Sequence, residues 1–422
     1  MNLNLCRKFC RGNCCLQKRF GMRMDTSKNV IRRLSSIKGK DVRIVISDNN
    51  WLETEAVDQL KTTTDLKGIC CGIGMPDLHP GKGQPIGAAF ISQNIIYPHL
   101  VGSDIGCGMG VWKLNIKPKK INVNKWDKSL YGLDDELSNE EIFNLDSLLP
   151  KNIAMTNFDR KLGTIGGGNH FSEIQQVEEV FNERLLGSLK LNKNSIVLLV
   201  HSGSRGIGQN ILRNHIDQQG AIGLDTKSKE AKEYLNKHDY ANEWGVVNRN
   251  IIAHRFFQKL NVSGDLLLDV SHNHVQPLSR ECAESLGYSG DDYWIHRKGA
   301  SPTASSLVMI PGSRGSLSYL VKPINDVRKT SASGFSLAHG AGRKWKRSDA
   351  KGRLVSRYDH KSVLQTPFSS RVICAHKDLA FEEAQQAYKN IDLVIRDLQL
   401  AGVIEVIASF KPLLTYKTRK KS

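Results

Sequence analysis

The chain has 422 residues, 40% of them hydrophobic, which is enough for one large core or two medium ones. Its 60 basic and 42 acidic side chains leave a net charge of +18, which favours polyanionic partners such as nucleic acid, although a merely basic, solvated surface remains an alternative. No apolar run approaches the roughly 20 residues that cross a bilayer, which argues against a membrane span.

The first 24 residues are basic, lack acidic side chains and contain four of the nine cysteines. We expect 1–24 to lie outside the fold, as a processed targeting arm, a basic tail or the product of a start upstream of Met24. The odd number and irregular spacing of the cysteines argue against a disulfide framework and for a reducing compartment. We therefore predict a cytoplasmic protein, with organellar targeting by the arm as the alternative, one domain at 25–417 and a basic tail at 418–422.

Short apolar runs dominate the rest of the chain. After a predicted strand at Val42–Ile46 and an amphipathic helix at Leu52–Leu60, five runs each end in a loop that carries a side chain able to bind a metal or an anion. These predicted strands are Ile95–Val101, Ile196–Val200, Leu266–Val270, Leu307–Ile310 and Phe335–Ala338. Helices predicted at Ser228–Leu260 and Leu379–Leu400 intervene without a βαβ rhythm. The pattern predicts an α+β fold: a single interwoven domain with mixed sheets around a central cleft for metal and nucleotide.

The loop Gly102–Gly108 places a carboxylate, Asp104, three residues before a thiol, Cys107. Both can bind one metal ion, and thiolate, carboxylate and imidazole ligands together suit manganese or zinc. A thiolate can also bridge two metals. The alternative is a buried structural cysteine beside a turn aspartate.

The segment Gly163–Glu173 contains three consecutive glycines, which let backbone amides approach a phosphate. Asn169, His170 and Glu173 follow within one helical turn. Neither a P-loop lysine pattern nor a full GxGxxG is present. The polar residues that follow the glycines make this loop a candidate site.

His201 and His272 each follow a strand-like run directly, where rigid support suits a metal ligand. A single histidine in such a place is usually only a satisfied polar residue. Together with Asp104, Cys107 and His170, they predict a shared metal site.

His339 stands between small residues in AHGAGR and is followed by several basic side chains. It is sterically open to attack phosphorus, and the nearby positive charge would offset charge on the phosphates. A loop histidine beside an RNA-binding surface is the alternative. The residues alone indicate metal-assisted phosphoryl or nucleotidyl transfer on nucleic acid.

Seven segments in order, MPDLHPGKGQPIGAAF, VGSDIGCGMG, GTIGGGNHF, HSGSRG, HRKGASP, PGSRGS and HGAGR, resemble the RtcB family of RNA ligases from about Asp41 to Lys417. The forms SDNNWLETEA, GMPDLHPGKG and LGTIGGGNHF are similar to the release factor H-coupled branch of that family.

The resemblance implies GTP- and manganese-dependent joining of an RNA 3′-phosphate or 2′,3′-cyclic phosphate to a 5′-hydroxyl. It implies that Cys107 bridges two Mn²⁺ ions, with Asp104 and His170 on one and His201 and His272 on the other. His339 would carry GMP as a covalent intermediate. The implied nucleotide contacts are Asn169, Glu173, Ser313, His339, Gly340, Ala341 and Lys417.

Two departures from the family pattern stand out. Family members tend to end soon after a lysine-glycine pair, whereas Lys417 is followed by TRKKS, which puts its contact with guanine in question. Arg314 occupies a position where other members often have methionine.

The resemblance also suggests a role in RNA repair, ribosomal RNA included, or in tRNA splicing, with functional coupling to a release factor H-like protein. The alternatives are a metal-dependent cyclic phosphoesterase and an RNA-binding scaffold without ligase activity.

Overall fold

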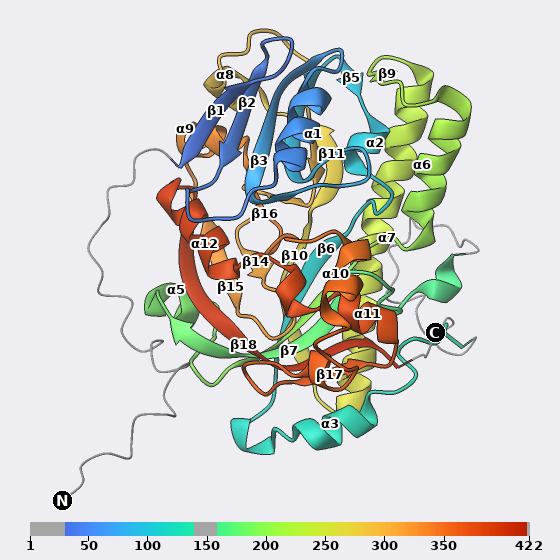
Figure 1. Cartoon of the computed structure of the whole chain (residues 1–422), viewed down its shortest axis with the longest axis vertical. Coiled ribbons are helices and arrows are strands. Elements are labelled where there is room, and N and C mark those ends of the chain that lie inside the picture. Colours follow the sequence, from blue (N-terminus) through green and yellow to red (C-terminus); the bar gives the residue numbers. More distant parts are fainter. Residues whose placement is uncertain (1–29, 139–157, 420–422) are drawn as a thin grey trace, which may run out of the picture.

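Two β-sheets frame the computed structural model of the chain, which describes residues 30–138 and 158–419. The predicted arm at 1–24 and the last three residues of the predicted tail lie outside this range. The first sheet is in the upper half of Figure 1 and the second in the lower half.

The first sheet has the order β1-β2-β3-β4-β12-β11. In that order, its strands are Ile31–Ser35, Asp41–Val45, Ile69–His79, Ile86–Gln93, Tyr293–Lys298 and Asn273–Pro277.

The second sheet has the order β10-β6-β8-β7-β18-β15-β14, and β17 (Arg371–Cys374) pairs with β18 outside this path. In that order, its strands are Gly264–Ser271, Gly108–Leu114, Ile196–Ser202, Phe171–Val180, Ile404–Thr418, Ser318–Pro323 and Val308–Pro311. Two small pairs complete the strands: β5 (Ile95–Ile96) with β9 (Leu224–Asp225), and β13 (Ala300–Pro302) with β16 (Ser336–Ala338).

Helices cover the sheets. They are α1 (Thr54–Thr64), α2 (Pro98–Val101), α3 (Val123–Ser129), α5 (Glu183–Ser188), α6 (Gly206–Gln219), α7 (Lys229–Leu260), α8 (Arg280–Ser285), α9 (Val327–Thr330), α10 (Arg347–Leu354), α11 (Lys377–Glu382) and α12 (Ile391–Leu400). Single 3₁₀ turns are η1 (Pro118–Lys120), η2 (Asp159–Lys161), η3 (Ser331–Ser333), η4 (Ser362–Leu364) and η5 (Gln385–Ala387).

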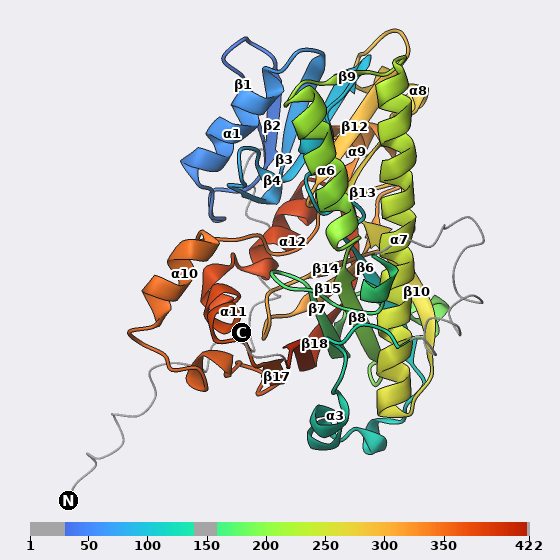
Figure 2. The same cartoon turned by 90° about the vertical axis from the view of Figure 1, so that its right-hand side faces the viewer.

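The long helix α7 runs beside α6 and past the second sheet, as Figure 2 shows. Its first turn is capped by Ser228, whose side chain accepts a hydrogen bond from the backbone N–H of Ala231. It ends at Asn261, which adopts the left-handed conformation usual after a helix. The predicted helix at Ser228–Leu260 is therefore confirmed.

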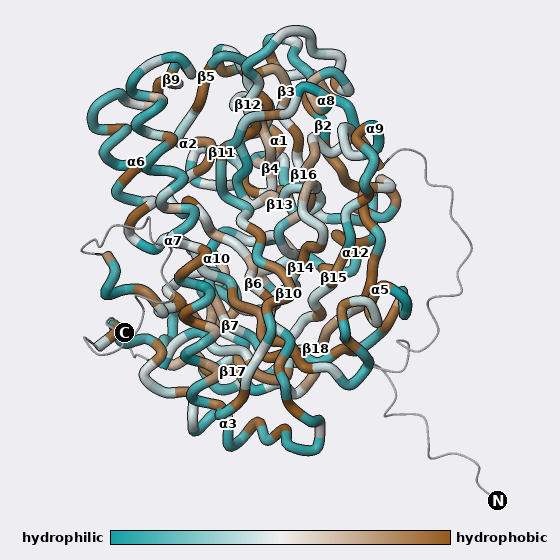
Figure 3. The backbone as a smooth tube through the Cα atoms, turned by 180° about the vertical axis from the view of Figure 1, so that it is seen from behind, coloured by the Kyte–Doolittle hydropathy of each residue, from teal (hydrophilic) through white to brown (hydrophobic). Residues whose placement is uncertain are grey.

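One hydrophobic core joins the two sheets. Ile73 and Ile91 of the first sheet belong to the same buried cluster as Val308 and Val406 of the second, together with Val394 of α12. In Figure 3 the hydrophobic segments lie largely inside the molecule, whereas the outer turns are mostly hydrophilic. The fold is thus α+β, with mixed sheets in a single domain, as the sequence predicted.

Two predicted elements were wrong in extent. Ile95–Val101 is not one strand, because Pro98 begins the short helix α2 after two paired residues. The predicted helix at Leu379–Leu400 is broken between Glu382 and Ile391, where a new helix begins with Asn390 as its cap.

None of the helices in the described ranges is long and apolar enough to cross a bilayer.

Candidate active site

Neighbouring strands of the second sheet bring metal-binding side chains to one edge. Gly108, the first residue of β6, is in register with Ser202 of β8 on one side and Ser271 of β10 on the other. Cys107, one residue before β6, therefore lies beside His272, one residue after β10. The backbone N–H of His272 donates to the carbonyl oxygen of Cys107 at 2.8 Å.

The next strand adds the remaining histidines. His201 near the end of β8 is paired with Phe171, the first residue of β7, so His170 lies at the same edge. Asp104 reaches this edge from the loop before Cys107. Strand register thus gathers Cys107, His170, His201 and His272, and the loop before β6 adds Asp104.

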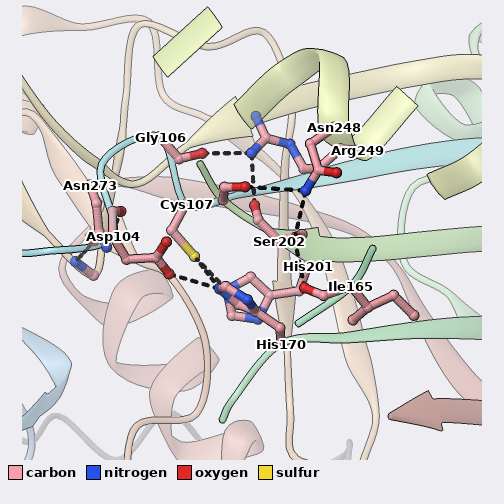
Figure 4. A network of polar contacts seen from close by, with 12 residues as sticks. Asp104, Gly106, Cys107, Ile165, His170, His201, Ser202, Asn248, Arg249 and Asn273 are labelled. Atoms are coloured by element: carbon pink, nitrogen blue, oxygen red, sulfur yellow. Dashed lines mark hydrogen bonds and ion pairs between the residues drawn. The ribbon is translucent and has the colours of Figure 1, made fainter. Parts of the chain in front are cut away.

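The ligand atoms form two overlapping groups around one thiol. Cys107 Sγ lies 3.3 Å from His170 Nε2 and 3.2 Å from His201 Nε2, and Figure 4 shows both contacts. Asp104 Oδ2 lies 2.7 Å from His170 Nε2. Cys107, His201 and His272 form one group and Asp104, Cys107 and His170 the other, with the ligand atoms of each group within 4.8 Å of one another.

Four of the five side chains are buried and Asp104 is half-buried, and the protonation states favoured by this burial fit a divalent cation. Burial, with the charge of Asp104 adding to it, raises the pKa of the Cys107 thiol well above its usual value. Burial also lowers the pKa values of His201 and His272 well below the usual value. Neutral imidazoles are the form that binds metal, and a cation favours the thiolate. Within the described ranges, the buried Nδ1 atoms of His170 and His272 have no hydrogen-bond partner. These donors suit a metal-dependent enzyme.

Arg249 of α7 ties the cluster's backbone together. Its guanidinium donates to the carbonyl oxygens of Gly106 at 2.6 Å and Ser202 at 2.9 Å, each next to a candidate ligand (Figure 4). Asp269 of β10 holds the same guanidinium in a buried ion pair at 2.5 Å. One side chain therefore links three of the strands that carry the cluster.

Asn248, which directly precedes Arg249 in α7, links the glycine-rich segment that begins at Gly163 to the same edge of the sheet. Its Oδ1 accepts from the backbone N–H of Gly163 at 2.8 Å, and its Nδ2 donates to Ser202 Oγ at 3.1 Å and to the carbonyl oxygen of Gly203 at 3.2 Å. Asn248 and Arg249 are both fully buried. The helix thus supports the cluster from behind.

A cavity of about 170 Å³ adjoins the cluster, with His201 in its wall. Six predicted nucleotide-binding residues line it: Asn169, Ser313, His339, Gly340, Ala341 and Lys417. Arg343 and Arg347 also line it and add positive charge. The cavity therefore presents cations and glycine-rich backbone beside the candidate metal ligands, as a polyphosphate requires.

His339 is fixed in the cavity wall by a buried carboxylate. Its Nδ1 lies 2.7 Å from Asp77 Oδ2 on β3, and its backbone N–H donates to the same oxygen at 3.3 Å. If Nδ1 carries the proton, the lone pair of Nε2 is free for nucleophilic attack. The His339 ring centroid lies 4.8 Å from that of His272, which places the candidate nucleophile beside the metal cluster.

The close approach of two segments depends on Gly342. Its φ of +71° is in the left-handed region, and a Cβ there would lie 2.2 Å from the carbonyl oxygen of Asp77. Lys389 anchors the two residues that flank Asp77 in the sequence: its Nζ donates to the carbonyl oxygens of Pro76 at 3.1 Å and Leu78 at 2.6 Å. Asp77 is thus held through its backbone on both sides.

Glu383 gathers the cations of the cavity. Lys417 Nζ lies 3.7 Å from it, Arg343 3.1 Å and Arg347 3.2 Å. Burial acts to raise the pKa of Glu383, but the charges of Lys417 and Arg343 outweigh it and lower that pKa to about 2. Lys417 lines the cavity although Thr418 and Arg419 follow it.

Glu173 is the one predicted nucleotide contact that does not line the cavity. It is buried behind the wall, where Thr415 donates to its Oε2 and Gln175 Nε2 donates to its Oε1 at 2.7 Å. Burial raises the pKa of Glu173 to about 7.

Sequence comparisons with known proteins place the chain in a family. A sequence model described as tRNA-splicing ligase RtcB matches residues 59–142 and 133–418. The chain is 45% identical over 374 residues to the RNA-splicing ligase RtcB2 of Escherichia coli, which covers 88% of this chain and 94% of that protein.

The chain belongs to the RtcB family. More distant members are the tRNA-splicing ligases RtcB of Archaeoglobus fulgidus, 26% identical over 86% of this chain and 91% of that protein, and of Nanoarchaeum equitans, 28% identical over 81% and 87%. This RtcB-family chain is therefore an RNA ligase, as its sequence predicted.

Sequence reasoning missed four side chains of the RtcB-family site: Asp77, Asn248, Arg249 and Glu383. A signal for Asn248 was present, because Trp244, Asn248 and Ile252 share one helical face, and a polar residue between two buried apolar ones indicates an internal hydrogen bond. Arg314, for which the sequence offered no role, is buried and donates to the carbonyl oxygens of Val363 and Ala380.

Proposed function

We propose that this RtcB-family ligase is GTP- and manganese-dependent and joins an RNA 3′-phosphate or 2′,3′-cyclic phosphate to a 5′-hydroxyl through GMP bound to His339. The observation that carries the proposal is the hydrogen bond from His339 Nδ1 to the buried Asp77 carboxylate, in the wall of a cavity that adjoins the metal cluster.

The first step is attack on GTP. His339 Nε2 attacks the α-phosphorus, a P–N bond forms, the bond to the β-phosphate breaks and pyrophosphate leaves. Asp77 keeps the proton on Nδ1 and stabilises the positive charge that develops on the ring. Arg343 and Arg347 lie in the cavity wall, where they can offset charge on the leaving phosphates.

The next steps transfer GMP to RNA and release it. An oxygen of the RNA 3′-phosphate attacks the phosphorus on His339, the P–N bond breaks and the RNA end becomes a mixed anhydride with GMP. The 5′-hydroxyl then loses its proton and attacks the RNA phosphorus. A new P–O bond joins the two RNA ends, and GMP leaves. A cyclic phosphate must first be opened by water to the 3′-phosphate.

Cys107 would contact two manganese ions, Asp104 and His170 would hold one and His201 and His272 the other. When bound there, the ions supply positive charge and orientation to the reacting phosphates. Asn169 would contact the nucleotide, Ser313 would lie near it and Lys417 would approach the guanine, whereas Glu173 would act from behind the wall through Thr415.

The test is the intact mass of the purified protein after incubation with GTP and manganese, compared between wild type and His339→Ala. We expect a mass increase equal to GMP in the wild type only. Manganese content measured in both proteins is the control, because the cluster does not include His339.

A wild type that gains no mass when fully loaded with metal, and does not ligate a cyclic-phosphate RNA, would contradict the proposal. Opening of the cyclic phosphate without GTP by such a protein would identify it as the phosphoesterase alternative.

The resemblance to the release factor H-coupled branch extends the proposal to repair of cleaved ribosomal RNA in cooperation with a release factor H-like protein. The measurement is the ratio of kcat/KM for nicked ribosomes and for a generic cyclic-phosphate oligomer. Equal values would contradict a dedicated ribosomal substrate.

A further inference from the structure

An exposed tryptophan directly follows a buried asparagine that is hydrogen-bonded to the strand carrying Asp77. Trp51 is 48% exposed, yet the residue before it is buried and anchored. Asn50 Nδ2 donates to the carbonyl oxygen of Pro76 at 3.3 Å and to Asp397 Oδ2 at 2.8 Å, and its Oδ1 accepts from the backbone N–H of Trp51 at 2.8 Å. Single exposed aromatic residues are common, but one whose preceding residue is anchored by buried hydrogen bonds is unusual.

The anchor connects Trp51 to the candidate nucleophile. Pro76 directly precedes Asp77, which binds His339. Lys344, five residues after His339, places its Nζ 5.2 Å from the centroid of the Trp51 ring. Two short segments therefore carry both the reacting histidine and this aromatic–lysine pair.

Lys344 is the available cation in this neighbourhood. Arg343 and Arg347 are paired with Glu383, and Lys346 is paired with Glu55 of α1 at 2.8 Å. Within the described ranges, Lys344 forms no ion pair of its own. Its backbone N–H donates to the carbonyl oxygen of Ala387 at 2.7 Å, which fixes the position from which its side chain extends.

We propose that Trp51 and Lys344 form a subsite for single-stranded RNA next to the end that reacts: a base stacks on the indole while Lys344 contacts a phosphate. Proteins that bind single strands use this combination of aromatic platforms and cations, and base stacking tolerates any sequence. The net charge of +18 is complementary to such a strand. The subsite rests on the proposed function, because it serves the RNA whose end meets His339.

The test measures steady-state ligation of a single-stranded cyclic-phosphate RNA by Trp51→Ala. We expect KM for RNA to rise about tenfold, since one stacked base is lost. The kcat at saturating RNA and the labelling of the protein by GTP alone should stay unchanged. Trp51→Phe should restore most of the affinity, whereas a role in packing alone would not produce this separation of KM from labelling. Lys344→Ala should raise KM less and reduce its dependence on salt.

Tyr131→Ala is a matched control. Tyr131 is 61% exposed and has Lys259 Nζ 4.0 Å from its ring centroid, so it is a similar aromatic–lysine pair. It follows α3, which lies at the opposite end of the molecule from α1 in Figures 1 and 2. We expect its KM for RNA to equal that of the wild type.

Binding of a fluorescein-labelled single-stranded oligoadenylate, followed by anisotropy without GTP, separates this subsite from the proposed function. Weaker binding by Trp51→Ala than by Tyr131→Ala supports the subsite even if the wild type is never labelled by GTP. Equal binding by these two variants, or an unchanged KM for Trp51→Ala, would overturn it.

Discussion

The candidate metal cluster and the cavity proposed to bind the nucleotide meet at His201 but are built in different ways. The cluster takes its ligands from Asp104 to His272, nearly all at adjacent strand ends, and fully buried side chains of α7 hold it from behind. The cavity joins residues as distant in sequence as His79 and Lys417, and one buried carboxylate, Glu383, pairs with its cations. Strand register thus fixes the cluster, whereas long-range ion pairs and hydrogen bonds fix the cavity.

Substitutions in the cavity wall should slow catalysis more than substitutions behind the metal cluster. In Asp77→Asn the side chain no longer offers His339 Nδ1–H a carboxylate, so the wrong tautomer becomes available. We expect the rate of labelling by GTP to fall on the order of 10⁴-fold, as for a triad aspartate. Rapid-quench labelling with radioactive GTP measures this rate.

Manganese content of Asp77→Asn should match the wild type, because the cluster does not depend on this carboxylate. Loss of metal together with labelling would show that cluster and cavity are not separable.

Substitutions behind the metal cluster should lower the free energy of unfolding more than substitutions in the cavity. Arg249→Met leaves Asp269 without its buried partner and should cost about 3–5 kcal/mol of unfolding free energy. The carbonyl oxygens of Gly106 and Ser202 also lose their donor, so manganese affinity should fall about 10–100-fold. Urea unfolding and competition with a chelator measure the two effects.

The double variant Arg249→Met, Asp269→Leu should regain stability but not manganese affinity, since it removes the stranded charge without restoring the two hydrogen bonds. Recovery of both would contradict a positioning role for Arg249.

Glu173 should make the free energy of unfolding depend on pH. Its folded pKa of about 7 lies above the usual 4.5, so between these values the folded state keeps a proton that the unfolded state has released. The free energy of unfolding should therefore fall as pH rises through this window, by roughly 3 kcal/mol in total.

Glu173→Gln cannot ionise and should lose this part of the pH dependence. Urea unfolding of both proteins without nucleotide, at pH 5 and pH 8, measures the difference. The same change in both proteins would exclude a buried, protonated Glu173.

The smallest expected effect concerns the helix that supports the cluster. Ser228→Ala removes the hydrogen bond that caps α7 and should destabilise the fold by about 1 kcal/mol. Manganese affinity should be unchanged, because Asn248 and Arg249 lie far from the first turn. Thermal unfolding and metal titration together measure this, and a parallel loss of affinity would show that the cluster depends on the whole length of α7.

The sequence predicted the cluster well because each ligand follows or precedes an apolar run, and adjacent strands bring such positions together. It missed Asp77 because this carboxylate lies inside a buried strand rather than in the loop after it, and its partner His339 is far away in the sequence. It missed Glu383 because its cationic partners come from two separate segments, at 343–347 and at Lys417, and no local sequence pattern records that they meet in space. The same limit applies to Glu173, a predicted nucleotide contact: Thr415 lines the cavity and Glu173 lies behind it.

The position of β18 has a consequence for synthesis on the ribosome. This strand lies between β7 and β15 in the second sheet and carries Lys417, yet it follows every other described strand in the sequence. The strands that carry the metal ligands emerge first, whereas the nucleotide cavity cannot close until β18 has been translated and inserted. If the proposed function holds, a nascent chain should thus be able to bind metal before it can react with GTP.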